Sequence, residues 1–357
     1  MRDLSLLPKA HLHLHLTGGM RPATLVDLAG AQGRTLPAGL LDPSSVDLDA
    51  TGLRGWLRFQ RLYDVARTVL TGPPEVRRVI REIVEDQLAA GARWLELQVD
   101  PSSYAGRLGG LQRAVEVVLD ALGQAGAELG VGTGLVLASN RTRHAAEAET
   151  HARVALRFAD RGVVGFGLSN DETRGDTREF EKAFRIARDG GLLAVPHAGE
   201  LRGPGSVRLA VERLGAARLG HGVRAVEEPE LLTELAERGV ACEVNPVSNV
   251  ALGVHASTAD SPVRTLRAAG VPVVLGADDP LLFRAGLVDQ YAALRATQQL
   301  TDHELADLAR CSVTASTAPT ELQRDLLDGI ARWLADWPRD IRSEAAGEGA
   351  PRPLEDP

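Results

Sequence analysis

The stretch AHLHLHLTGG, residues 10–19, decides how the rest of this chain is interpreted. Its apolar residues predict a buried β-strand that ends at the Thr-Gly-Gly turn. Residues two apart in a strand point to the same side and lie about 7 Å apart. His13 and His15 can therefore converge on one metal ion, and neutral imidazole is a common ligand of zinc-type ions. The stretch indicates metal chemistry at the end of a strand.

Short apolar runs alternate with longer amphipathic stretches, such as 74–90, 113–129 and 177–188. Strand–helix alternation implies parallel pairing, and eight such units can close into a (β/α)8 barrel of the TIM type. An open doubly wound sheet is the alternative, but it would need fewer strands and usually a phosphate-binding glycine loop, and we find no convincing loop of that kind. The eight predicted strands are Ala10–Leu16, Trp94–Val99, Val131–Ala138, Val163–Leu168, Leu192–Pro196, Ala217–Leu219, Ala241–Val244 and Val271–Leu275.

The segment between the first two strands, residues 17–93, is too long for a single crossover. It contains helical patterns at 22–31 and 55–70, so we expect a helical insertion that caps the barrel mouth. The aromatic residues of the second pattern suit either the mouth or the packing of that helix; they are Trp56, Phe59 and Tyr63. We expect one barrel domain over residues 1–342, followed by a flexible tail, 343–357, rich in Ala, Gly, Glu and Pro.

The residues with metal-binding or acid–base chemistry share one position in the predicted barrel. Each follows or ends a strand, which in such barrels is the face that carries the active site. Closure makes strands one and eight neighbours, so three imidazoles and a carboxylate can surround one cation and leave a place for water. His13 and His15 end the first strand, His197 follows the fifth, His221 the sixth, and Asp278 and Asp279 the eighth.

Each of these residues also has a simpler interpretation, because an isolated histidine is more often a packed core residue than a ligand. His11 is expected on the same strand face as His13 but deeper, in a packed or supporting role. The run Asp278-Asp279-Pro280 could form a turn or a helix cap, although it follows an apolar run. The remaining histidines are expected on the surface: His144, His151, His255 and His303.

Composition limits the classes of function. The 357-residue chain is 44% apolar and has a net charge of −8, which argues against a nucleic-acid backbone as partner. Two cysteines, Cys242 and Cys311, make neither a disulfide framework nor a cysteine-rich metal site. Residues 1–9 lack a signal peptide's apolar core, and no run approaches the length of a membrane span. We expect a cytoplasmic protein with no membrane partner.

Four motifs, in this order, strongly resemble the adenosine deaminase family of metal-dependent amidohydrolases. They are LPKAHLHLHL (7–16), HAGE (197–200), RLGHG (218–222) and GADDPL (276–281), and the likeness covers roughly residues 6–335. The resemblance implies an amidohydrolase-type barrel and hydrolytic loss of ammonia from C6 of a 6-aminopurine nucleoside. It also implies one Zn²⁺ per chain, with Fe²⁺ or Co²⁺ suiting the same ligands: His13, His15, His197 and Asp278.

The resemblance also implies roles for three further residues. Glu200 donates a proton to purine N1, a task that suits a carboxyl group whose pKa is raised by burial. His221 holds and polarises the attacking hydroxide, and Asp279 bonds to purine N7. Related hydrolases with two metals often bridge them with a lysine at the end of strand four; here that end reads LSNDE (168–172), which favours a single metal.

Two positions on the substrate side depart from the family pattern. Thr17 stands where the family commonly has an aspartate that contacts the ribose 5′-hydroxyl, and Asn170 stands where LAGDE has its glycine. The backbone amide of Asn170 can still reach purine N3. Loss of the acid removes a repulsion for an anionic 5′ group, and Arg141 is a candidate partner for it. These features resemble deaminases of aminodeoxyfutalosine, a 5′-extended adenosine of menaquinone synthesis, so that compound and adenosine are the two expected substrates.

Two other classes of function remain as alternatives. One is another mononuclear-metal hydrolase, acting on an amide, lactone or phosphoester; the other is a non-catalytic nucleoside-binding barrel. Glu200 beside a ligand histidine favours deamination of a ring, and the complete ligand set favours an enzyme. A cytidine-deaminase type of site is excluded because it requires cysteine thiolates. The expected partner is a small purine nucleoside, and the oligomeric state is not indicated by the sequence.

Overall fold

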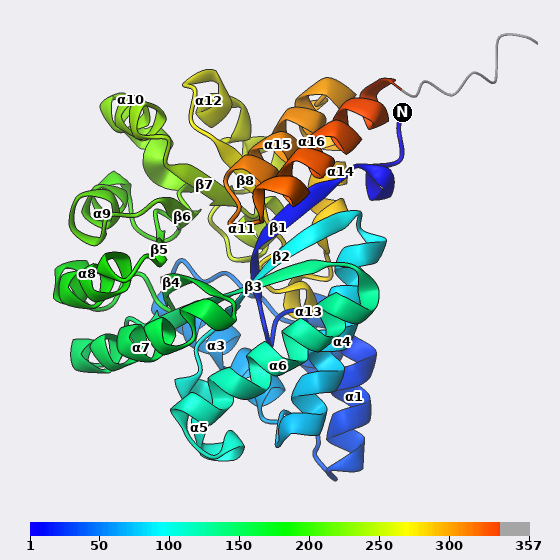
Figure 1. Ribbon diagram of the computed structural model, residues 1–357, viewed down its shortest axis with the longest axis vertical. Helices are drawn as coiled ribbons and strands as arrows, with labels where there is room; N and C mark the ends of the chain where they lie inside the picture. The colour runs from blue at the N-terminus through cyan, green and yellow to red at the C-terminus, as the bar shows by residue number, and fades with distance from the viewer. Residues whose placement is uncertain (336–357) are drawn as a thin grey trace, which may run out of the picture.

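The computed structural model describes residues 1–335, and its centre is a barrel of eight parallel strands with helices on the outside (Figure 1). Each strand pairs with its neighbours in chain order, from β1 to β8. This order confirms the predicted (β/α)8 fold. The strands are β1 (Lys9–His15), β2 (Ala92–Val99), β3 (Gly132–Asn140), β4 (Val163–Ser169), β5 (Leu193–Ala198), β6 (Arg218–His221), β7 (Ala241–Val244) and β8 (Val273–Leu275).

The barrel closes where the first and last strands meet. An isolated parallel bridge joins Leu14 to Asp278. The amide of His15 donates to the carbonyl of Asp278 at 3.1 Å, and the amide of Asp278 donates to the carbonyl of His13 at 3.1 Å. Closure therefore brings the histidines of β1 and the aspartates after β8 together.

The outer helices bury one apolar face against the strands. In α4, Val76, Val79, Ile80 and Ile83 are buried, the i, i+3, i+4, i+7 spacing of an amphipathic helix. The helices that follow the insertion are α4 (Pro73–Ala89), α5 (Ser102–Leu108), α6 (Leu111–Leu129), α7 (Ala145–Arg157), α8 (Glu181–Asp189), α9 (Pro204–Leu209), α10 (Pro229–Arg238), α11 (Pro246–Ala251), α12 (Val263–Ala268), α13 (Pro280–Phe283), α14 (Leu287–Gln298), α15 (Asp302–Thr314) and α16 (Thr320–Ala335).

The expected helical insertion after β1 is present as α1 (Pro22–Ala31), α2 (Ala38–Leu41) and α3 (Leu53–Arg67). Helix α3 buries Trp56 and Phe59. The ring of Phe59 stacks on that of Phe283 with centroids 6.0 Å apart, which joins α3 to the segment that follows β8. The insertion thus packs on the end of the barrel where the predicted site residues lie.

The structure corrects the expected orientation of His11. The ladder between β1 and β2 pairs His11 with Leu95 and Leu14 with Leu97, so β1 carries an extra residue between the two pairs. Such a bulge turns the following side chains to the other face. His11 therefore does not share the face of His13: its Nδ1 lies 2.6 Å from Oε1 of Gln87 on the outer helix α4. Its packed role is as expected.

Two further expectations are wrong. His151 is buried, not on the surface, because α7 turns it towards β3, where its Nδ1 lies 2.9 Å from Oγ of Ser139. The helix expected over 177–188 is divided into a 3₁₀ turn, Thr177–Phe180, and α8. His144 and His303 are exposed, and His255 is half-buried. The predicted boundary at 342 and the tail after it lie outside the described residues.

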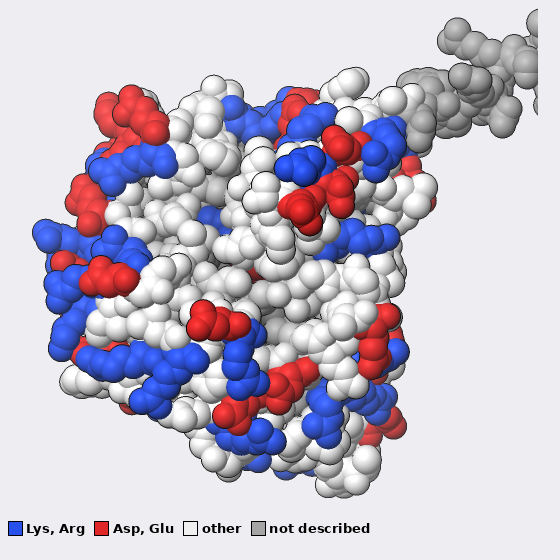
Figure 2. Space-filling view, in the orientation of Figure 1, with Lys and Arg blue, Asp and Glu red and all other residues white. Residues whose placement is uncertain are grey.

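Charge is distributed without a large region of one sign on the face seen in Figure 2. Basic and acidic side chains alternate around its edge, and its centre is mostly uncharged. Both cysteines are free. Among residues 1–335, no helix combines the length and the apolarity needed to cross a bilayer.

Candidate metal centre and active site

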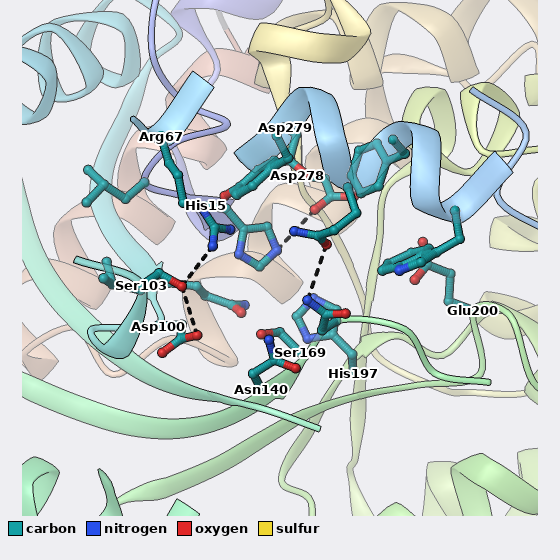
Figure 3. A pocket seen from close by; sticks show the side chains of 18 of the residues that line it. His15, Arg67, Asp100, Ser103, Asn140, Ser169, His197, Glu200, Asp278 and Asp279 are labelled. Carbon is teal, nitrogen blue, oxygen red and sulfur yellow. Dashed lines mark hydrogen bonds and ion pairs between the residues drawn. The ribbon is translucent and has the colours of Figure 1, made fainter. Parts of the chain in front are cut away.

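Three imidazoles and a carboxylate converge where β1, β5 and β8 end. Ligand atoms of His13, His15 and His197 all lie within 4.8 Å of one another, and so do those of His13, His221 and Asp278. The ring centroids of His13 and His197 are 4.7 Å apart. Oδ1 of Asp278 lies 3.2 Å from Nε2 of His15 and 3.5 Å from Nε2 of His13. The predicted ligands therefore surround one point, and Figure 3 shows three of them, His15, His197 and Asp278.

The donor set fits a zinc-type ion. Nε2 of His13 is buried and has no hydrogen-bond partner within the described part of the chain, an arrangement that is costly unless a ligand occupies the site. Glu243 accepts from Nδ1 of His13 at 2.8 Å, which leaves Nε2 unprotonated in the neutral ring and available to a metal. Ser248 similarly donates to Oδ2 of Asp278 at 2.6 Å and leaves Oδ1 towards the imidazoles.

A buried ionic network continues from the ligand His13 into the barrel interior. Glu243 also accepts from Nε of Arg218 at 2.7 Å, and the guanidinium of Arg218 pairs with Glu96. Glu96 in turn accepts from the amide of Thr317 at 2.7 Å. Sequence reasoning missed this network, although a signal was present: Glu96, Arg218 and Glu243 are charged residues in largely apolar strands. Such residues are almost never fully buried unless they are paired.

The turn after β5 carries Glu200, and the backbone amides of this turn donate hydrogen bonds to the carboxylate of Glu172. Oε2 of Glu172 accepts from the backbone amides of Glu200, Leu201 and Arg202 at 2.9, 2.7 and 2.9 Å. Oε1 accepts from the amide of Gly199 at 2.6 Å and from Oγ of Ser206 at 2.5 Å. The sequence motif at 168–172 includes Glu172, but its role as an anchor was not predicted.

Glu200 is suited to hold a proton. Burial, followed by the nearby carboxylates of Asp278 and Glu172, raises its pKa well above the ordinary value. Its Oε1 lies 3.4 Å from Nε2 of His221. Burial likewise raises the pKa of Asp279, and the neighbouring Asp278 adds to the effect. Burial opposes the ionisation of Asp278 too, but the adjacent imidazoles of His13 and His15 outweigh it and hold that pKa well below its usual range.

The orientation of His221 is set by two asparagines. Nδ2 of Asn249 and Nδ2 of Asn245 lie 3.0 and 3.4 Å from Nδ1 of His221. Burial lowers the pKa of His221 to about 3, so its ring is neutral. With Nδ1 accepting, the proton is on Nε2, which faces Glu200 and Oδ2 of Asp278. Sequence reasoning did not single out either asparagine.

The backbone is strained at the site. Asn170, His221 and Asp278 have φ values of 79°, 67° and 61°, the left-handed region that costs a non-glycine residue about 1–3 kcal/mol. All three lie directly after or at the end of a strand and line one pocket. The strain indicates that their positions are kept for function.

The pocket has a volume of about 90 Å³ and is bounded by the metal-ligand cluster and the insertion. Trp56, Phe59 and Tyr63 of α3 line it, so they form part of its wall as well as packing the helix. Asn170 also lines it and donates from Nδ2 to Oε1 of Gln60 at 3.2 Å. The pocket is also lined by residues not selected from the sequence; they include Arg67, Gln98, Asp100 and Ser103.

Two predicted substrate contacts lie elsewhere. The guanidinium of Arg141 is buried and donates to the carbonyl of His197; it supports the backbone of β5 and is not among the pocket-lining residues. Thr17 is fully buried, and its Oγ1 lies 2.6 Å from the hydroxyl of Tyr104, whose ring does line the pocket. Position in the sequence, just past a strand end, did not reveal which way either side chain points.

Barrels with three imidazoles, a carboxylate and a buried acid at this end form a class of metal-dependent hydrolases, and the fold and site put this chain in that class. The family model "Adenosine deaminase" matches residues 8–333. The chain belongs to the adenosine deaminase family.

Relatives of this chain are named after different substrates. A Streptomyces virginiae protein named "Putative adenosine/adenine deaminase" is 56% identical over 93% of this chain and 98% of its own length. An aminodeoxyfutalosine deaminase of Acidothermus cellulolyticus is 32% identical, over 80% of this chain and 81% of its own.

Solved structures agree with the fold. An adenine deaminase from Arthrobacter aurescens superposes with a TM-score of 0.84 at 28% identity, over 92% of this chain and 99% of its own. Arabidopsis ADAL complexed with IMP gives 0.81 at 25% identity, over 92% and 97%. The chain is a metal-dependent deaminase of the adenosine/adenine type, which acts on a 6-aminopurine. The aminodeoxyfutalosine deaminases, to which the departures at Thr17 and Asn170 pointed, are more distant than the Streptomyces relative.

Proposed function

We propose that this chain removes the 6-amino group of a purine nucleoside, either adenosine or a 5′-extended adenosine such as aminodeoxyfutalosine, with one zinc ion held by His13, His15, His197 and Asp278. The observation that carries the proposal is the convergence of these four residues beside a buried Glu200. Water supplies the oxygen that adds to C6, the bond from C6 to the amino nitrogen breaks, and ammonia leaves. The relatives' names add free adenine as a competing substrate.

Glu200 and His221 have different roles: Glu200 donates a proton, and His221 orients the attacking oxygen. A zinc-type ion held by His13, His15, His197 and Asp278 would lower the pKa of water towards neutrality and so supply hydroxide at neutral pH. Glu200, with its raised pKa, gives its proton to N1 as C6 becomes tetrahedral, which neutralises the charge pushed into the ring. The Nε2–H of His221 donates to the attacking oxygen and orients it towards C6.

Other pocket residues hold the purine in plane. Asp279 has a raised pKa, and its Oδ1 is buried without a partner in the described residues; as an acid it donates to N7. The backbone amide of Asn170 is near enough to the pocket to serve N3. Phe59 and Trp56 cover the base and exclude water from it.

Ammonia release from a small panel tests the proposal. The zinc-reconstituted protein is given adenine, adenosine and aminodeoxyfutalosine, and kcat/KM is measured for each. We expect one of the two nucleosides to exceed adenine. Preference for adenine would overturn the assignment to a nucleoside.

The same protein tests the two alternative classes. Absence of ammonia from every purine, with turnover of an amide, lactone or phosphoester, would make the chain another amidohydrolase. Full purine affinity in metal-free protein, without turnover, would make it a nucleoside-binding barrel. The cytoplasmic location and the link to menaquinone synthesis remain predictions.

A further inference from the structure

Arg67, which lines the pocket, has hydrogen-bonding capacity that is only partly used. Nη1 of Arg67, at the end of α3, donates to Oγ of Ser103 at 2.8 Å and lies 3.3 Å from Oδ1 of Asp64. Its guanidinium carbon lies 4.8 Å from the ring centroid of Tyr63. Nε of Arg67 is buried and has no partner among residues 1–335. The side chain is therefore held in place by one nitrogen while another donor is unsatisfied.

A second unsatisfied group belongs to another residue that lines the pocket. Gln98 of β2 is 1% exposed, and neither its Oε1 nor its Nε2 has a hydrogen-bond partner among the described residues. Both residues line the pocket. Buried amide and guanidinium donors without partners are costly, so two of them on residues that line one pocket point to a ligand in that pocket that pairs with these side chains.

The shape of a purine indicates which part of the ligand contacts Arg67 and Gln98. With C6 at the metal cluster and N1 at Glu200, the N9 position lies across the ring system and points away from both. Arg67 and Glu200 lie on opposite sides of the pocket (Figure 3). The group attached to N9 therefore extends towards Arg67.

The unpaired edge of the Arg67 guanidinium suits an anion, and two carboxylates, Asp64 and Asp100, lie near it. The Nε edge of a guanidinium is a planar fork that suits a carboxylate or phosphate. Asp64, which pairs with Arg67, is largely exposed, so solvent screens it. Asp100 lines the wall too, but its oxygens accept from Ser102 at 2.6 Å and from Ser103 at 3.1 Å. Thr17, which contacts the pocket residue Tyr104, adds no charge.

We infer that Arg67 and Gln98 form a subsite for an anionic group, carboxylate or phosphate, carried by the N9 substituent of the 6-aminopurine. The inference rests on the proposed deamination and names the class of its substrate. Arg67 has the role that the sequence had suggested for Arg141, namely contact with an anionic 5′ group. It acts as a specificity-determining residue and takes no part in proton transfer.

The test compares substrates that differ only in this group: adenosine, AMP and adenosine 5′-carboxylic acid. We expect zinc-loaded wild-type protein to deaminate at least one of the anionic compounds with a kcat/KM about tenfold or more above that of adenosine. Arg67→Met should lower the ratio of anionic to neutral kcat/KM by about 10–100-fold, the range of a hydrogen bond to a charged group. Arg67→Lys, which keeps the charge but loses the fork, should fall between the two.

Arg61→Met is the matched control, because Arg61 is an exposed arginine of the same helix and should keep the wild-type ratio. Binding of the 6-oxo products inosine and IMP, measured by calorimetry, needs no turnover. Tighter binding of IMP that depends on Arg67 would support the subsite even if no purine were deaminated. Ammonia release from adenosine with a ratio of one or less, or with a ratio unchanged in Arg67→Met, would overturn the subsite and leave the deamination intact. The anionic compound with the higher kcat/KM relative to adenosine shows whether the subsite prefers a carboxylate or a phosphate.

Discussion

Glu172, at the end of the β4 motif, fixes the position of Glu200 by accepting the amide of that residue and of its neighbours. One carboxylate satisfies four consecutive backbone amides, from Gly199 to Arg202. Such a turn of converging N–H groups is a natural anion site, and here the anion belongs to the protein itself. The position of the proposed proton donor is thus set by a residue in the turn that follows the neighbouring strand, β4.

Replacing Glu172 tests this relationship. In Glu172→Gln, an amide nitrogen would face backbone donors and at least one of them would lose its acceptor. We expect kcat to fall about 10–100-fold, because a misplacement of about 1 Å is enough for such a loss, while zinc content stays at one per chain. Glu179→Gln alters an exposed glutamate of the following turn and should have no effect on kcat. Equal rates in the two variants would refute the positioning role.

Removing the proton of Glu200 should leave the metal in place. Glu200→Gln keeps the shape of the side chain but cannot donate an acidic proton to N1, so we expect kcat to fall by about three orders of magnitude or more. Because the pKa of Glu200 is raised, the wild-type kcat should hold at neutral pH and decline as rising pH deprotonates the group. Metal analysis accompanies the kinetics, and near-normal turnover in the variant would contradict the assignment.

Glu243, which accepts a hydrogen bond from the predicted ligand His13, should control metal affinity. Glu243→Gln keeps a hydrogen-bond acceptor near Nδ1 of His13 but leaves Arg218 without one of its two carboxylate partners. We expect zinc affinity to fall about 10–100-fold, measured by competition with a chelator. His13→Ala and Asp278→Ala should lose the metal outright. Glu237→Gln, an exposed change on α10, is the control, and unaltered affinity in Glu243→Gln would show that the network serves stability alone.

The barrel and the residues that surround the metal position could be predicted because both are encoded locally. Alternating apolar runs give the strands, and parallel closure brings their carboxyl ends together, so His13 and Asp278 meet although they are far apart in the sequence. The strand face on which His11 lies could not be predicted from the local sequence. A single bulge, set by the pairing of β1 with β2, reverses its face, and nothing in the alternation of β1 reveals it.

The supporting and substrate residues depend on side-chain direction, which the sequence does not give. Arg141 follows a strand end, as a substrate residue would, yet it turns under His197. Arg67 is one of several arginines on an amphipathic helix, and only its place at the end of α3 beside Ser103 brings it to the pocket. A charged residue within an apolar strand, such as Glu243, was the one available signal for the buried network.

Gly18 should be required because its Cα lies against Asp279. An ideal Cβ at position 18 would lie 1.7 Å from Oδ1 of Asp279, so Gly18→Ala must displace that carboxyl group. We expect kcat/KM to fall about tenfold or more, as in Asp279→Ala, with zinc retained. At Gly30, in α1, an added Cβ meets nothing within 4 Å. Gly30→Ala should therefore keep full activity. Comparable kcat/KM in the two alanine variants would disprove the contact.

Lys9, at the start of β1, should make the stability of the protein depend on pH. Its Nζ is buried and donates to the carbonyls of Leu4 and Ala90 at 2.9 and 2.5 Å. Burial, with a smaller contribution from Arg93, lowers its pKa from 10.5 to about 7. Between these two values the unfolded chain binds one more proton than the folded chain, so the free energy of unfolding rises with pH. Below pH 7 both states are charged, and the full cost of burying the ammonium group is present.

Comparison with Lys9→Met isolates this effect, because the other titrating groups are common to both proteins. From pH 7 to pH 9, we expect the stability of wild type relative to Lys9→Met to increase by about 2 kcal/mol, measured by denaturant unfolding. Lys182, the chain's other lysine, is exposed and pairs with Glu149 at 2.9 Å. Lys182→Met should follow the wild-type pH curve. Parallel curves for wild type and Lys9→Met would mean that Lys9 stays charged in the folded protein, held by its two carbonyl acceptors against the cost of burial.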